Sequence, residues 1–189
     1  MIYVPRRLRV WLGYTDGPLT ETLALDDEQF RAAFVRSDYS AARIQPELLR
    51  PVPSWWRWVP FLHVTMASAL APVSPFVYLP KDMWQRFQAH ALTHKDQAVI
   101  IHEQVHIARY KNVSWVRAAR YVWSRKERLT EELLGISAEM AYLQRQGLPY
   151  DIERKARQFS SRPYFWLGSE EESRAVLRRL WDMVRSGPK

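Results

Sequence analysis

The chain of 189 residues contains no cysteine. This absence excludes a disulfide framework, a thiolate zinc site, an iron–sulfur cluster and a cysteine nucleophile. Histidine is scarce, with five residues in the chain, and none follows His106. Any metal site downstream of that residue must therefore use carboxylates.

Long apolar runs are also missing. No apolar segment of signal-peptide length follows the arginines near the N-terminus, so we expect a cytoplasmic protein, with a phage-associated one as an alternative. The uncharged stretch after Trp58 is long enough to suggest a membrane span, but four prolines and several polar residues interrupt it. Because such groups are costly in lipid, two buried strands joined by a loop are predicted instead, and no transmembrane segment is expected.

The rest of the composition is that of a folded protein. Hydrophobic residues make up 47% of the chain and aromatic residues 13%, which is enough for a substantial core. The length suits one domain, residues 1–189, with a sheet-containing part at 1–95 and a helical part at 96–189. Periodicity predicts strands at Leu8–Leu12, Leu62–Met66 and Phe76–Leu79, a loop at Pro46–Pro53, and helices at Asp26–Val35, Asp82–Leu92, Asp96–Lys111, Ser114–Ser124, Lys126–Gln146, Tyr150–Gln158 and Ser169–Val184.

Positive charge exceeds negative charge, with 28 Lys and Arg against 20 Asp and Glu and a net charge of +8. The basic residues are spread along the chain, so nucleic-acid binding is only weakly indicated. The densest stretch, Arg109 to Arg128, interleaves basic and aromatic side chains. This stretch could form a face that binds phosphates or another anion. The favoured interpretation is a solvated helix whose aromatic residues pack inward.

One motif carries chemistry. The segment from His102 to His106 reads His-Glu-Gln-Val-His within a predicted helix. Residues four apart lie on one helical face, so both imidazoles can bind one zinc ion, and Glu103 beside them can act as general base toward a zinc-activated water. The flanking residues are apolar, as a buried metal-bearing helix requires. A Zn²⁺ ion is therefore the expected cofactor.

A catalytic zinc needs a third protein ligand. Glu139 is the favoured carboxylate because it shares one face of the predicted helix Lys126–Gln146 with Gly135. A glycine one turn before it would allow this helix to approach the HExxH helix closely. Glu132 and Glu131 are the alternatives, and Asp151 is a weaker one.

With its downstream glutamate, this motif resembles the gluzincin group of zinc metallopeptidases, particularly the small bacterial and phage-encoded ones. The resemblance runs from about Phe61 to Leu143 and implies that His102, His106 and Glu139 bind zinc and that Glu103 is the general base. The segment Pro75–Pro80 is similar to the edge strand that pairs with an extended peptide substrate in this group.

Together these features predict an α+β, zincin-like fold with a small twisted N-terminal sheet, the HExxH helix and a mainly helical C-terminal half. The predicted function is a zinc-dependent metallopeptidase that hydrolyses a peptide or amide bond, with peptidoglycan peptides among the candidate substrates. A catalytically inactive zinc-fold protein that binds nucleic acid or another anionic partner through its basic face is the alternative.

Overall fold

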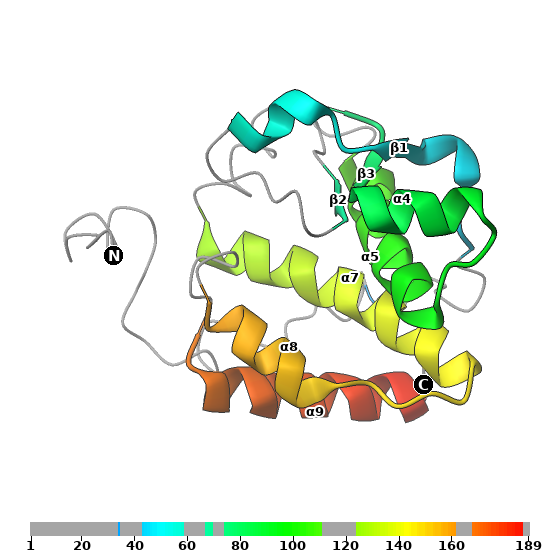
Figure 1. The fold of residues 1–189 in the computed structure, drawn as a ribbon. Helices are drawn as coiled ribbons and strands as arrows, with labels where there is room; N and C mark the ends of the chain where they lie inside the picture. Colours follow the sequence, from blue (N-terminus) through cyan, green and yellow to red (C-terminus); the bar gives the residue numbers. More distant parts are fainter. Residues whose placement is uncertain are drawn as a thin grey trace.

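The structure is a computed structural model that describes residues 34, 43–58, 67–69, 74–110, 124–161 and 168–186. It is a mixed α+β fold in which helices predominate among these residues (Figure 1). The elements are the 3₁₀ helices η2 (Pro46–Leu48) and η3 (Ser54–Trp58), the strands β1 (Leu49–Pro51), β2 (Ser68–Ala69) and β3 (Val77–Leu79), and the helices α4 (Lys81–Gln88), α5 (His94–Tyr110), α7 (Arg125–Arg145), α8 (Ile152–Phe159) and α9 (Glu170–Ser186).

Several predicted elements lie outside the described residues. These are the strands Leu8–Leu12 and Leu62–Met66 and nearly all of the helices Asp26–Val35 and Ser114–Ser124. Within these two helices the structure describes Phe34, which is helical, and Ser124, which caps α7.

The described sheet has three short strands in the order β1-β3-β2. β3 pairs in parallel with β1, with Leu49 opposite Val77, and antiparallel with β2, with Ala69 opposite Val77. The expected strand at Phe76–Leu79 is therefore present as β3, but it is central, so its expected position at an edge is wrong. The loop predicted at Pro46–Pro53 is also corrected, because this segment contains η2 and supplies β1.

Helix α5 is buried on two sides. Ile100 and Ile107 pack with the sheet and α4, whereas Ala98 and Ile101 belong to a second cluster formed with α7, α8 and α9. In Figure 1, α5 lies accordingly between the sheet and α7. A helix that is buried on two faces must be apolar nearly all round, which explains the apolar flanks of the HExxH motif.

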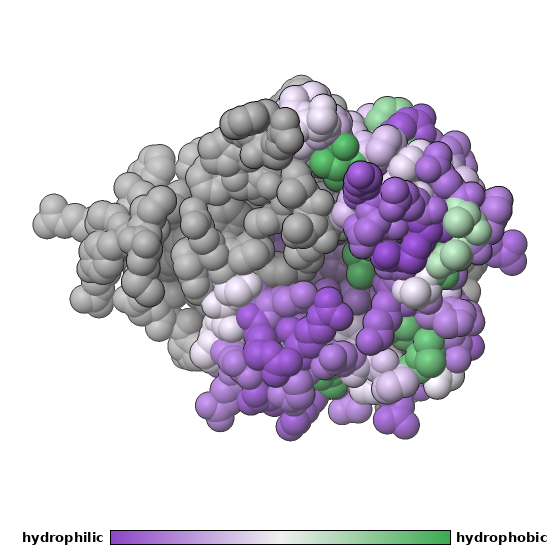
Figure 2. All heavy atoms as spheres, in the orientation of Figure 1, coloured by the Kyte–Doolittle hydropathy of each residue, from purple (hydrophilic) through white to green (hydrophobic). Residues whose placement is uncertain are grey.

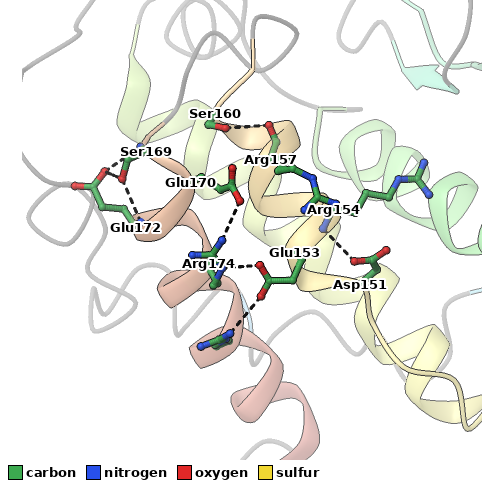
Figure 3. Close-up of polar contacts among 10 residues, drawn as sticks. Asp151, Glu153, Arg154, Arg157, Ser160, Ser169, Glu170, Glu172 and Arg174 are labelled. Carbon is green, nitrogen blue, oxygen red and sulfur yellow. Dashed lines mark hydrogen bonds and ion pairs between the residues drawn. The ribbon is translucent and has the colours of Figure 1, made fainter.

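Helices α7, α8 and α9 form the lower part of the molecule (Figure 1). α8 and α9 pack together, and their outer surface carries ion pairs from Glu153 on α8 to Arg174 and Arg178 on α9 (Figure 3). The buried residues between them and α7 include Phe159, Leu177 and Leu180. α8 is thereby held against the rest of the core, which brings its buried residue Lys155 to α7.

Local side-chain caps set where the helices begin. Thr93 Oγ1 accepts a hydrogen bond from the Asp96 amide, and Asp96 Oδ2 accepts one from the Thr93 amide, which is a reciprocal capping box at the start of α5. Ser169 and Glu172 form the same arrangement at the start of α9. The caps of α7 and α8 are Ser124 and Asp151.

Asp96 gives α5 a stabilising contact that depends on pH. Arg86 donates two hydrogen bonds of 2.8 Å to its carboxylate. Burial works against the charged form of Asp96, but the hydrogen bonds from Arg86 and Thr93 outweigh it and lower its pKa below the usual value. A carboxyl group with a lowered pKa stabilises the fold above its unfolded-state pKa, and this contribution is lost as the pH falls through the folded-state pKa.

We therefore expect Asp96→Asn to have a lower melting temperature than the parent at pH 7. Below about pH 4 the melting temperatures of the two proteins should become more similar. Circular dichroism melts at pH 7, 5, 4 and 3 measure this difference, with the exposed residue Asp182→Asn as the control. An equal difference at every pH would show that the charge of Asp96 is not what stabilises α5.

On the face that Figure 2 shows, the described residues are mostly hydrophilic, and their hydrophobic areas are small and separate. Trp55, with 57% of its surface exposed, is the large hydrophobic residue exposed among the described residues. None of the helices that the structure describes has the length and apolar character needed to cross a bilayer.

Candidate metal centre

His102 and His106 lie on one face of α5, as their spacing predicts. Both side chains are buried, and their Nε2 atoms are 3.1 Å apart. The Nδ1 atom of His106 is buried and has no hydrogen-bond partner among the described residues. Two buried ring nitrogens thus meet at one point inside the protein.

Glu132 on α7 faces the same point. Its Oε2 lies 3.5 Å from His102 Nε2 and its Oε1 lies 3.8 Å from His106 Nε2. One ligand atom from each of the three residues fits within 4.8 Å of the others. A tetrahedral ion with bonds of about 2 Å separates its ligand atoms by about 3.3 Å, so these three donors fit zinc in both chemistry and spacing.

Glu139 occupies a different position from the one expected of a ligand. Its Oε2 lies 3.4 Å from His102 Nδ1, the ring nitrogen that faces away from His106, and 3.2 Å from Lys155 Nζ. A carboxylate at Nδ1 cannot share an ion with Nε2 across the same imidazole ring. The geometry therefore places Glu132, and not Glu139, beside both Nε2 atoms. Glu139 Oε2 lies at ion-pair distance from the far ring nitrogen of His102 but forms no hydrogen bond with it.

The other candidate carboxylates are committed elsewhere. Both oxygens of the buried Glu131 accept hydrogen bonds from Arg109, at 2.5 and 2.8 Å. Asp151 caps α8 by accepting a hydrogen bond from the Arg154 amide. Glu131 and Asp151 thus make structural contacts, whereas Glu132 faces both histidines.

Gly135 allows α7 to pass directly over the His102 ring. A Cβ atom at this position would lie 2.7 Å from His102 Nε2 and 2.8 Å from its Cδ2. Real side chains essentially never approach so closely, so the imidazole occupies the space that any other residue would need. The close helix approach predicted from the glycine is confirmed.

Glu103 follows His102 in the chain and contacts the sheet. Its Oε2 accepts a 2.7 Å hydrogen bond from the Ala69 amide on β2. Burial, together with the charge of Glu132, raises the pKa of Glu103 to about 7 against the opposing effects of His102, the Ala69 amide and Lys155. A carboxyl group that titrates near neutrality is suited to both taking up and releasing a proton.

The two histidines differ in how readily they are protonated. Burial disfavours a charged His102, but contacts with Glu132 and Glu139 outweigh this and raise its pKa to about 9. Burial dominates at His106 and lowers its pKa to about 4. A metal ion would therefore compete with a proton at His102, because ligands must be deprotonated to bind.

No protein-family model, curated protein or solved structure matches this chain. What the chain can do must therefore be inferred from the arrangement of its own residues.

Sequence reasoning did not identify three contacts that shape the site. Arg109, Lys155 and the Ala69 amide reach Glu131, Glu139 and Glu103 from different elements. Lys155 carried one signal in the sequence, because it shares a face of α8 with the buried residues Ala156 and Phe159. A lysine on an apolar helix face implies a buried anionic partner.

The basic stretch from Arg109 to Arg128 is described only at its ends. Arg109 is directed to Glu131, and Arg128 is buried. These two arginines thus lie inward, whereas the solvated-helix interpretation expects arginines on the outside. Arg109 belongs to α5 and Arg128 to α7, and residues 111–123 lie outside the described residues, so neither interpretation of the stretch is tested.

Proposed function

We propose that this chain is a zinc-dependent peptidase or amidase. The observation that carries the proposal is the convergence of His102, His106 and Glu132 within 4.8 Å, with Glu103 next to His102 in the chain. Two imidazoles and one carboxylate are a ligand set of catalytic zinc, which keeps a further coordination position open. When bound, zinc would supply Lewis-acid activation of the water and of the scissile carbonyl.

Glu103 is assigned the proton transfers. Because the Ala69 amide holds Oε2, Oε1 is the oxygen that would take a proton from the attacking water. As the water oxygen bonds to the carbonyl carbon, that proton moves to Glu103, and it then passes to the amine nitrogen as the carbon–nitrogen bond breaks. Glu103 would thus act first as the base and then as the acid of the same reaction.

β2 is the strand that we assign to substrate binding. It lies at one end of the described sheet order, and its Ala69 contacts the general base. An extended peptide that pairs with a strand at this position would place its backbone near Glu103. This assignment replaces the one made for Pro75–Pro80, whose strand β3 is paired on both sides.

Removal and return of the metal tests the proposal. We expect the protein to cleave members of a fluorogenic peptide library that includes peptidoglycan stem peptides, to lose this activity after chelation, and to regain it with about one equivalent of Zn²⁺. His106→Ala should remain inactive after zinc is returned. A protein that binds zinc but cleaves no peptide or amide, and instead binds DNA with a steep salt dependence, would support the alternative binding function.

A further inference from the structure

Lys155 is a buried cation on α8, a helix that contributes no residue to the metal ligands. Its side chain is 10% exposed, as is that of Glu139, and the His102 side chain is 5% exposed. A buried ammonium group is costly unless it is paired. Lys155 therefore has a specific partner in Glu139, 3.2 Å away.

The same carboxylate oxygen links this lysine to the metal centre. Glu139 Oε2 lies 3.2 Å from Lys155 Nζ and 3.4 Å from His102 Nδ1. On the opposite side of the ring, His102 Nε2 faces Glu132 and His106. Lys155, Glu139 and His102 thus form a continuous chain from α8 through α7 to α5.

We infer that Lys155 is a positioning residue that acts through Glu139 to hold His102 in the geometry and tautomer needed for metal binding. A carboxylate that accepts the Nδ1 proton leaves the lone pair on Nε2, the atom directed at the metal. In the structure Glu139 Oε2 lies at ion-pair distance from both Nδ1 and Lys155 Nζ. Lys155 thus balances the charge of the buried carboxylate and keeps it beside the ring. This inference rests on the proposed zinc function.

The role of Lys155 differs from that of an ordinary buried ion pair. A pair that served stability alone would leave metal affinity unchanged once the protein has folded. If Lys155 is a positioning residue, replacing it must change metal affinity, and this change must disappear when Glu139 is also replaced. These two results distinguish a positioning role from a purely stabilising one.

Metal binding by single and double variants tests the inference. Zinc affinity is measured by chelator competition, and the ligand field by the visible absorption of the Co²⁺-substituted protein, for the parent, Lys155→Met, Lys155→Arg, Glu139→Gln and the double variant Lys155→Met/Glu139→Gln. Arg157→Met, an exposed residue on the same helix (Figure 3), is the matched control. Circular dichroism confirms that each variant is folded at the assay temperature.

We expect Lys155→Met to weaken zinc binding by about 10- to 100-fold and to shift the Co²⁺ bands, whereas Lys155→Arg restores most of the affinity. In the Glu139→Gln background, Lys155→Met should cause no further loss, because residues that act through one contact are not additive. Parent-like affinity and spectrum in Lys155→Met, or full additivity in the double variant, would overturn the inference and leave the proposed function intact. A parent that binds no metal would overturn the proposed function, and this inference with it.

Discussion

Glu103→Gln is expected to bind zinc as the parent does and to hydrolyse peptides roughly 100- to 10,000-fold more slowly. Glutamine is close to glutamate in size, and its amide oxygen can still accept the hydrogen bond from Ala69. It cannot take a proton from water at neutral pH. The substitution therefore removes proton transfer while the contact between α5 and β2 is kept.

A control substitution at an exposed glutamate shows whether the loss of activity is specific to position 103. Hydrolysis rates and zinc content are compared with those of Glu171→Gln, an exposed residue on α9 that should match the parent in both. If Glu103→Gln cleaves peptides at the parent rate with normal zinc content, Glu103 is not the general base. If it loses zinc as well, its role is to support the metal.

Gly135→Ala adds a single methyl group but should lower both the stability of the fold and its zinc affinity. The added methyl group would lie 2.7 Å from His102 Nε2, the atom that faces the other donors. Either the ring or helix α7 must move, which costs about 1–3 kcal/mol of stability. This exceeds the ~1 kcal/mol that alanine gains over glycine within a helix. Zinc affinity should fall by about 100-fold because a ligand is displaced.

The sign of this effect should reverse when the imidazole is removed. In a His102→Ala background the imidazole atoms nearest to the added methyl group are absent. Gly135→Ala should then stabilise the fold by about 1 kcal/mol. Urea unfolding of the two single variants and the double variant measures this. Destabilisation of equal size in both backgrounds would mean that contact with His102 is not the reason for glycine at this position.

The chemistry of the site could be predicted from the sequence further than its geometry could. The HExxH spacing places both histidines on one helical face whatever the rest of the fold, and the structure brings their Nε2 atoms to 3.1 Å. The close approach of the second helix was also predictable, because a glycine inside an otherwise strong helix usually marks a close packing contact.

The choice between Glu132 and Glu139 could not be made from the sequence. These residues are two turns apart on the same face of α7, so helical periodicity predicts the same orientation for both and cannot distinguish which one is the ligand. Which of them meets Nε2 and which meets Nδ1 depends on how α7 crosses α5 and on the lysine that α8 brings to Glu139. Both are properties of tertiary packing.

The ends of short elements were the least predictable part of the fold. α4 ends at Gln88, before the predicted Leu92, because His90 adopts a left-handed φ of 54° and closes the helix without glycine. β1 contains three residues that end in proline, too few to show alternation. Where Gly147 supplies the left-handed residue after α7, the predicted stop is found.

We propose that His102, His106 and Glu132 bind one zinc ion and that Glu139 supports His102 on the Nδ1 side of its ring. Plasma mass spectrometry of zinc per chain, after equal dialysis, tests it on the parent, His102→Ala, Glu132→Ala and Glu139→Ala. We predict about one zinc per chain in the parent, almost none in the His102 and Glu132 variants, and partial retention in the Glu139 variant. No zinc in the parent even when it is supplied, or zinc retained by Glu132→Ala and lost by Glu139→Ala, would contradict this ligand assignment.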